Sequence, residues 1–231
     1  MQMQTRLDRY SLANLGSVIV DRSFANAKSG WLYQSAKRGL DVVLASLLLV
    51  ISLPVVVAAM MAIRVTSPGP VIFAQVRSGH KGKPFVCFKL RTMVNNAERV
   101  LEEDTLLRDA FVQCWKLPSD PRVTTVGRFL RKTSIDELPQ LFNVLRGEMS
   151  IVGPRPVQLT ELRDLYGTAA SILTAIKPGL TGLWQVSGRS LMSYDERVAL
   201  DLSYAETQSF WLDVKVILQT IPAVLMRRGA I

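Results

Sequence analysis

An almost uninterrupted apolar run, Val42–Ile63, dominates the pattern of hydrophobic and polar positions along this chain. Drawn as one helix, its 22 residues would reach about 33 Å, just enough to cross a hydrocarbon core of about 30 Å. However, Ser52 and Pro54 fall in its middle, and a proline inside a helix removes a backbone hydrogen bond and kinks the helix. Each half alone would reach only about 17 Å. We therefore favour a helix–break–helix over residues 37–65 that enters the membrane and returns, with a spanning helix as the alternative.

The charges beside this run also favour a re-entrant hairpin. Residues 1–38 carry a net charge of +4 and residues 64–231 a net charge of +6. Basic flanks tend to remain on the cytoplasmic side of a membrane, so neither flank is marked for export. We interpret residues 1–36 as a mobile N-terminal arm with one short helix, Leu12–Val20, and residues 66–231 as a cytosolic domain.

The rest of the chain is predicted to form one small hairpin among helices. Val71–Arg77 and Pro84–Arg91 alternate as two strands around a turn at Ser78–Lys83. Helical periodicity or capping residues predict helices at 94–115, 126–131, 157–176 and from Ser193 onward, while residues 177–189 form a glycine-rich turn, a short strand and a second turn. The expected fold class is therefore α/β, mostly α with a small β-hairpin.

The segment 209–226 is mostly apolar, but Asp213, Lys215 and Gln219 interrupt it and a pair of arginines follows it. This profile suits an amphipathic helix that lies in the membrane interface, with its arginines near the lipid headgroups. A helix in the protein core is the alternative.

A further amphipathic helix is predicted near the middle of the chain. Leu138, Leu141, Phe142 and Leu145 recur at the spacing of one buried helix face. Gly147 is a fitting end for this helix, because glycine readily adopts the left-handed conformation that terminates helices.

Two adjacent carboxylates, Asp136 and Glu137, open this helix. Ser134 and Glu137 have the spacing of a capping box, which would make the acids structural. Pro139 argues against that, because with Ser134 as N-cap it would lie inside the helix, whereas with Asp136 as N-cap it would be the third residue and cost little. In that second register Glu137 has no local role. From these residues alone, helix capping and catalysis both remain open.

Cations that could bind phosphate accompany the acidic pair. Arg155 lies between two prolines, which restrict the backbone and hold a guanidinium suited to bidentate phosphate binding. Lys89 and Arg91 share one face of the second strand, and Arg131 precedes the acids. The alternatives are a loop arginine without a ligand and solvated charges on an edge strand.

The glycine-rich segment offers weaker candidates for nucleotide binding. Trp184 could stack on a base, and Gln185 or Arg189 could hydrogen-bond to a nucleotide. The spacing of the glycines fits no phosphate-loop pattern. These residues are therefore candidates by residue type alone.

Composition narrows the chemistry and the partners. The chain of 231 residues is 48% hydrophobic yet carries a net charge of +9, which suggests a membrane together with an anionic ligand, with nucleic acid as the other partner of a basic chain. His80 is the one histidine, so multi-histidine metal sites are excluded and carboxylates must carry acid–base chemistry. Two cysteines, Cys87 and Cys114, make no disulfide framework and favour a reducing compartment.

Several segments occur here in a recognisable order. An apolar hairpin with a mid-run proline is followed by Lys89–Met93, Arg131–Leu141, Ser150–Pro156 and Lys177–Gly182. Over about residues 35–229 the chain thereby resembles the bacterial sugar transferase family, the monotopic phosphoglycosyl transferases. The Ser-Pro often found at the membrane break of that family appears here as Ser52-Leu53-Pro54, a slight departure.

The resemblance implies transfer of a hexose 1-phosphate from UDP-galactose or UDP-glucose to undecaprenyl phosphate, with release of UMP, as the first membrane step of exopolysaccharide synthesis. It implies that Asp136 is the nucleophile of a covalent phosphosugar-aspartyl intermediate, and that Asp136 and Glu137 hold Mg²⁺. The residues expected to bind phosphate or substrate are Lys89, Arg91, Arg131, Arg155, Gln185 and Arg189.

The implied setting is the cytoplasmic face of the bacterial inner membrane, with residues 66–231 as the catalytic domain. The implied partners are the UDP-hexose, undecaprenyl phosphate and membrane lipid, without nucleic acid, and a homo-oligomer is compatible with the chain. The alternative is a non-enzymatic, basic, membrane-anchored scaffold that binds anionic lipid or nucleic acid. Galactose and glucose differ in the orientation of one hydroxyl, and the sequence points to neither.

Overall fold

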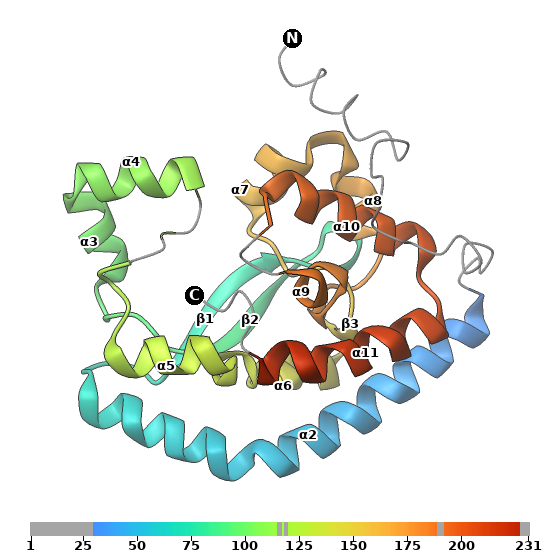
Figure 1. The fold of residues 1–231 in the computed structure, drawn as a ribbon, viewed down its shortest axis with the longest axis horizontal. Coiled ribbons are helices and arrows are strands. Elements are labelled where there is room, and N and C mark those ends of the chain that lie inside the picture. Colours follow the sequence, from blue (N-terminus) through green and yellow to red (C-terminus); the bar gives the residue numbers. More distant parts are fainter. Residues whose placement is uncertain (1–29, 115–116, 118–119, 189–191, 227–231) are drawn as a thin grey trace.

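Most of the chain is helical, with two small sheets near the centre of the molecule (Figure 1). The computed structural model describes residues 30–114, 117, 120–188 and 192–226. The predicted mostly helical fold with a small β-hairpin is confirmed. The predicted helix Leu12–Val20 lies outside the described residues.

The apolar run forms one helix, α2 (Trp31–Thr66), of 36 residues. At a rise of 1.5 Å per residue it is about 54 Å long, and Figure 1 shows it curving along one side of the molecule. The predicted break at Ser52 and Pro54 is wrong, because the helix continues through both residues. A proline removes one backbone hydrogen bond, and a long helix can absorb that loss by bending. Residues 31–36, expected in the N-terminal arm, are the first turns of α2.

The outer side of α2 is apolar and open. Val50, Ile51 and Leu53 are each more than half exposed. By length and composition alone, α2 could cross a membrane. Such a continuous exposed apolar surface is consistent with a membrane anchor.

Both ends of α2 are attached to the same domain. Near its start, Arg38 donates to two carbonyl oxygens close to the end of α6 (Gln140–Arg146), at 2.6 and 2.7 Å. Beyond its end, the Arg91 guanidinium donates to the carbonyl oxygens of Ser67 and Pro68, at 2.7 and 2.8 Å. Helix α2 is therefore fixed to the domain at two distant points.

The predicted hairpin is confirmed as β1 (Ile72–Ser78) and β2 (Pro84–Leu90), which pair antiparallel. Asn143 of α6 fixes β2 in place. Its side-chain amide donates to the Val86 carbonyl at 2.7 Å and accepts from the Phe88 N–H at 3.1 Å. Helix α6 therefore holds a fixed position relative to the hairpin.

The helix predicted for residues 94–115 is instead two helices, α3 (Ala97–Glu103) and α4 (Thr105–Cys114). Asp104 separates them, and its carboxylate accepts a hydrogen bond from the Leu107 N–H at 2.9 Å. Aspartate favours such a capping position over a helix interior, which explains the division. The helix predicted at 126–131 is confirmed as α5 (Thr125–Thr133).

Helix α6 ends at Gly147, as predicted, and this glycine has a positive φ of 78°. Its predicted buried face is only partly correct. Leu141 is fully buried, but Phe142 is 47% exposed. Asn143, which is hydrogen-bonded to β2, and Val144 take the adjacent core positions, and Phe142 turns outward.

The C-terminal half consists of short elements around a parallel strand pair, β3 (Ser150–Val152) and β4 (Gly179–Thr181). The other elements of the chain are η4 (His80–Gly82), α7 (Leu159–Glu161), η6 (Leu162–Tyr166), η7 (Gly167–Ala169), α8 (Ala170–Thr174), α9 (Leu183–Ser187), α10 (Tyr194–Thr207) and α11 (Phe210–Leu225). The single helix expected at 157–176 is thus a series of short turns, and the second turn expected within 177–189 is α9. The predicted capping box of Ser193 and Glu196 opens α10.

The main core lies where α2 meets the domain. It includes Ala45 of α2, Leu141 and Val144 of α6 and Val216 of α11. The first half of α2 is therefore part of the folded domain, and the same packing fixes α6 and the turn that precedes it.

Candidate active site

The two acids lie in a short 3-10 turn, η5 (Ile135–Glu137), ahead of α6. Ser134 precedes them with a left-handed φ of 58° as the C-cap of α5, and its side chain makes no capping bond to η5. Pro139 is the N-cap of α6. Neither predicted register is therefore correct, because Ser134 forms no capping box and Asp136 does not cap α6. The fixed φ of proline favours a helix that begins directly behind it.

Glu137 is paired with two cations. Its Oε1 lies 3.0 Å from Lys89 Nζ and 2.9 Å from a terminal nitrogen of Arg155. Burial opposes its ionisation, but Arg155 and Lys89 hold the pKa of Glu137 well below its usual range. Glu137 is therefore an ionised group that keeps two cations at this place.

Asp136 has the opposite environment. It is only 8% exposed, and within the described part of the chain its carboxylate forms no salt bridge. Burial and the charge of Glu137 raise the pKa of Asp136 to about 6, against the opposing effect of Lys89, Arg131 and Arg155. The site therefore holds one acid that is fully compensated and one that is not.

The structure brings three of the predicted cations to the acids. Lys89 and Arg155 contact Glu137 directly. Arg131, whose Nε donates to Thr92 Oγ1 at 2.9 Å, is close enough for its charge to favour ionised Asp136. Arg91 is not brought there, because its guanidinium is bound to the backbone beyond the end of α2.

Of the three residues predicted to contact a nucleotide, two are buried and one lies outside the described residues. Gln185 lies buried on α9, and its Nε2 donates to the Leu180 carbonyl at 3.4 Å. Arg189 lies outside the described residues. Trp184 is 9% exposed, and its ring centroid lies 5.7 Å from the guanidinium carbon of Arg155. A buried ring beside a cation leaves little of the indole for stacking on a base.

A close backbone approach positions Arg155. The Gly153 N–H donates to the Thr181 carbonyl at 2.9 Å, and the Gly179 N–H donates to the Pro154 carbonyl at 2.7 Å. A Cβ at position 179 would lie 2.1 Å from the backbone nitrogen of Gly153, so only glycine fits there. The glycine-rich segment therefore fixes the loop that carries Arg155, instead of cradling a phosphate itself.

A second charged cluster lies behind Arg155, and sequence reasoning missed it. Arg197 of α10 pairs with Glu161 at 3.1 Å, and its guanidinium carbon lies 4.8 Å from the Trp184 ring centroid. Arg77 of β1 also approaches Glu161, at 3.7 Å. A signal was present: Arg197, Asp201 and Tyr204 recur at the spacing of one helix face, which would have placed charged side chains on the buried side of α10.

Asp136 and Glu137 suit Mg²⁺ only as part of its ligand set, with substrate phosphate supplying further ligands. The described residues contain no group of three or more His, Cys, Asp or Glu side chains that could hold a metal. Mg²⁺, however, is commonly held by one or two carboxylates together with substrate phosphates. Asp136 has a carboxylate without a salt bridge in the described chain, and burial together with the charge of Glu137 raises its pKa, which a bound cation would oppose. Asp136 and Glu137 therefore suit an ion that arrives with phosphate.

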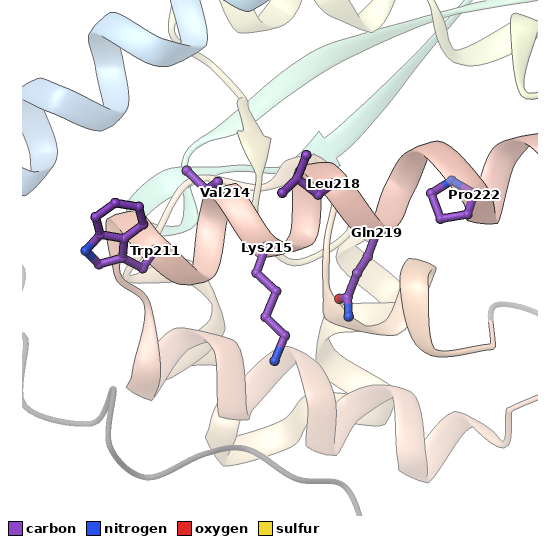
Figure 2. Close-up of a pocket in the computed structure, with 6 residues that line it drawn as sticks. All are labelled: Trp211, Val214, Lys215, Leu218, Gln219 and Pro222. Atoms are coloured by element: carbon purple, nitrogen blue, oxygen red, sulfur yellow. The ribbon is translucent and has the colours of Figure 1, made fainter.

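A shallow groove of about 510 Å³ runs along the surface of α11. Figure 2 shows the side chains that line it: Trp211, Val214, Lys215, Leu218, Gln219 and Pro222. The groove is largely apolar, and none of the residues around the two acids lines it. It is separate from the charged site.

Comparison with known proteins gives consistent matches. The family model for the bacterial sugar transferases matches residues 32–227. Over 199 residues the chain is 46% identical to the exopolysaccharide production protein ExoY of Rhizobium meliloti, covering 84% of this chain and 88% of that protein. It is 44% identical over 198 residues to the undecaprenyl-phosphate galactose phosphotransferase of Salmonella typhimurium, covering 84% of this chain and 41% of that protein. It is also 44% identical over 202 residues to the UDP-glucose:undecaprenyl-phosphate glucose-1-phosphate transferase of Caulobacter vibrioides, covering 84% and 71%.

Proposed function

The chain belongs to the bacterial sugar transferase family, and we propose that it transfers a hexose 1-phosphate from UDP-galactose or UDP-glucose to undecaprenyl phosphate, releasing UMP. The names of two relatives, one specifying galactose and one glucose, support both donors equally. The relatives named for an activity are transferases, so the alternative of a non-enzymatic scaffold has no support among them. The relative from Rhizobium meliloti supports a role in exopolysaccharide synthesis.

The observation that carries the proposal is the contrast between the two acids. Asp136 is a buried carboxylate without a salt bridge in the described chain, beside a Glu137 that keeps Lys89 and Arg155 at hand. A nucleophile must approach an anionic diphosphate, so its own charge and that of the phosphate need nearby cations. Lys89 and Arg155 are the nearby cations that this arrangement supplies.

The reaction then has two balanced steps. A carboxylate oxygen of Asp136 attacks the β-phosphorus of the UDP-sugar, and the bond from that phosphorus to the bridging oxygen breaks, so that UMP leaves. The enzyme now carries the sugar phosphate as an acyl phosphate on Asp136. A phosphate oxygen of undecaprenyl phosphate next attacks the same phosphorus and releases Asp136 as a free carboxylate.

The surrounding residues stabilise the charge that develops on the transferred phosphoryl group. Arg155 presents a forked set of donors, Lys89 a compact cation, and Arg131 a further positive charge beside Asp136. We assign Mg²⁺ to Asp136 and Glu137, where it supplies charge neutralisation between carboxylate and phosphate when bound. Gln185 and Arg189 remain our candidates for nucleotide contacts, whereas Arg91 is better assigned to holding α2.

We place the enzyme on the cytoplasmic face of the inner membrane, with α2 as one bent helix whose two ends both lie on that side. One domain binds both the start of α2, through Arg38, and the backbone beyond its end, through Arg91. A spanning helix would put these two points on opposite sides of a hydrocarbon core of about 30 Å, which a single domain cannot reach. The apolar groove on α11 supports the further assignment of that helix to the membrane interface.

Covalent labelling tests the proposed nucleophile. Radiolabelled UDP-sugar without undecaprenyl phosphate should label the protein in the presence of Mg²⁺, and Asp136→Asn should abolish the label. Asp164→Asn is the matched control, because Asp164 is an exposed acid paired only with Arg163 in the described chain. Label that persists in Asp136→Asn would overturn the assignment of the nucleophile.

The same assay tests the metal and identifies the sugar. A chelator should stop both the labelling and UMP release, and added Mg²⁺ should restore them. A panel of UDP-hexoses, scored by UMP release, identifies the donor. No release with any UDP-hexose would favour the scaffold over the enzyme.

A further inference from the structure

We propose that Arg197, acting through the indole ring of Trp184, positions Arg155 for the transferred phosphate. The proposal rests on the proposed function, because it gives two further residues a role in the same reaction. Arg197 and Trp184 are positioning residues in this view, and neither touches the reacting atoms.

The first step is that Arg155 depends on few contacts. In the described part of the chain, its guanidinium makes one ion pair, with Glu137, and one ring contact, with Trp184. Its side chain is 29% exposed, which leaves donors available to a phosphate. The orientation of Arg155 therefore depends on how firmly the Trp184 ring is held.

The second step is that Arg197 holds this ring. Its guanidinium carbon lies 4.8 Å from the Trp184 centroid and that of Arg155 lies 5.7 Å away, both within the range of cation–π attraction of about 6 Å. The two arginines carry like charges and repel each other; Glu137 raises the pKa of Arg155, and the charge of Arg197 opposes that rise. An indole ring that attracts both cations offsets this repulsion.

The third step is that Arg197 is itself fixed. Glu161 accepts from it at 3.1 Å, and the Tyr194 hydroxyl does so at 3.2 Å. Tyr194 also donates to Glu161, which closes a triangle of contacts. Glu161 accepts in addition from the Gln158 N–H at 3.3 Å, only three residues beyond Arg155. The cluster of Arg197, Tyr194 and Glu161 is therefore attached to the segment that carries Arg155.

Rescue by a conservative variant distinguishes positioning from mere stability. An aromatic ring at position 184 keeps the cation–π contact with Arg155, whereas an aliphatic side chain there loses it. The ion pair of Arg155 with Glu137 remains in all the variants below.

The experiment is single-turnover labelling by UDP-sugar without acceptor, measured against UDP-sugar concentration in the full-length enzyme. Trp184→Leu and Arg197→Gln should label about tenfold more slowly at saturating UDP-sugar. Arg197→Lys keeps the charge but loses the planar guanidinium, so it should not restore the rate. Trp184→Phe keeps an aromatic ring, and because Trp184 Nε1 has no hydrogen-bond partner in the described chain it should recover most of the rate. Arg163→Gln, at an arginine 75% exposed, is the control for losing a surface charge.

Three outcomes would overturn the proposal. In the first, folded Arg197→Gln and Trp184→Leu label at the parental rate at saturating UDP-sugar. In the second, Trp184→Phe loses as much rate as Trp184→Leu, and in the third, Trp184→Leu raises only the KM for the UDP-sugar, as expected of a base-stacking ring. Thermal unfolding shows which variants are folded, and the conservative Arg197→Lys and Trp184→Phe keep the test valid if the others are not. A parent enzyme that fails to label, or an Asp136→Asn that labels, would instead contradict the proposed function.

Discussion

Asp136 and Glu137 are neighbours in sequence, yet their surroundings push their pKa values apart. Arg155 and Lys89 keep Glu137 ionised at any physiological pH, while burial and that same glutamate make Asp136 reluctant to ionise. An acid that is costly to ionise is a stronger base and nucleophile than a compensated one. The turn η5 therefore assigns two roles to two chemically similar side chains.

This contrast predicts opposite pH shifts for two charge removals. We expect the rate of labelling of Asp136 to rise with pH along an acid limb that follows the pKa of this acid, which is about 6 before Mg²⁺ binds, because the carboxylate is the attacking form. Glu137→Gln removes a negative charge that raises the pKa of Asp136, so the limb should move to lower pH. Lys89→Gln removes a positive charge that lowers this pKa, so the limb should move to higher pH. Both variants should be slower by about a hundredfold.

Single-turnover labelling at a series of pH values measures both shifts. Arg163→Gln, remote and exposed, should leave the limb in place. If the acid limb of the labelling rate moved in the same direction in Glu137→Gln and in Lys89→Gln, the opposite effects that we assign to Glu137 and Lys89 on the pKa of Asp136 would be wrong.

At the residue scale, the sequence located the acids and three of their cations but not the whole site. Lys89 and Arg155 were recognisable because strand alternation and flanking prolines restrict where they can point, and Arg131 because it precedes the acids in the sequence. Arg91 satisfied the same alternation, yet it binds carbonyl oxygens beyond the end of α2. Alternation specifies a face of a strand but not which partner on that face a side chain will find. Arg197 was missed because its contacts with Trp184 and Glu161 arise only when α10 packs against α9 and α7.

At the element scale, the β3–β4 pair determines where Arg155 lies. Gly179→Ala should destabilise the protein by about 1–3 kcal/mol, because its Cβ would meet the backbone nitrogen of Gly153 at 2.1 Å. It should also slow labelling, since the loop carrying Arg155 must move. Gly39→Ala is the matched control: its Cβ has nothing within 4 Å, and alanine in a helix should gain roughly 0.5–1 kcal/mol. Thermal unfolding together with labelling measures both variants.

A Gly179→Ala enzyme with parental stability and rate would show that the two strands can separate at no cost. It would also mean that the glycine-rich segment does not fix the loop that carries Arg155. A loss of activity in Gly39→Ala would instead point to a general intolerance of substitution.

The elements that periodicity predicted well are those whose partners lie nearby in sequence. The hairpin and the capping box of α10 are local features and are confirmed. The continuity of α2 through Pro54 and the outward position of Phe142 depend on packing between distant segments. Pro54 signals a lost hydrogen bond, but whether a helix breaks or merely bends there depends on what supports it on either side.

At the scale of the whole molecule, the anchor and the catalytic domain form one folded unit. Asp41 of α2 is almost fully buried, and its carboxylate accepts from Ser150 Oγ at 2.9 Å and from the Ile151 N–H at 2.8 Å. Lys37 reaches the Val152 carbonyl at 2.9 Å. These contacts go to β3, the strand that leads directly to Arg155. With α2 in the membrane, as we propose, its depth would also set the position of the active site relative to the lipid surface.

This coupling gives a direct prediction of topology. If α2 enters and leaves on one side, cysteines introduced singly at Gly30 and Ser67 should both react with an impermeant thiol reagent from the cytosolic side. Val50→Cys is the control, because Val50 is 73% exposed in the protein but lies on the apolar surface assigned to lipid, so it should react little in membranes and freely in detergent. The parent protein, whose Cys87 is buried, provides the background. Reaction at only one of Gly30 and Ser67 from the cytosolic side would mean that α2 spans the membrane. The polar contacts at its two ends could then not both form, and the attachment of a single domain to both ends of the anchor would have to be abandoned.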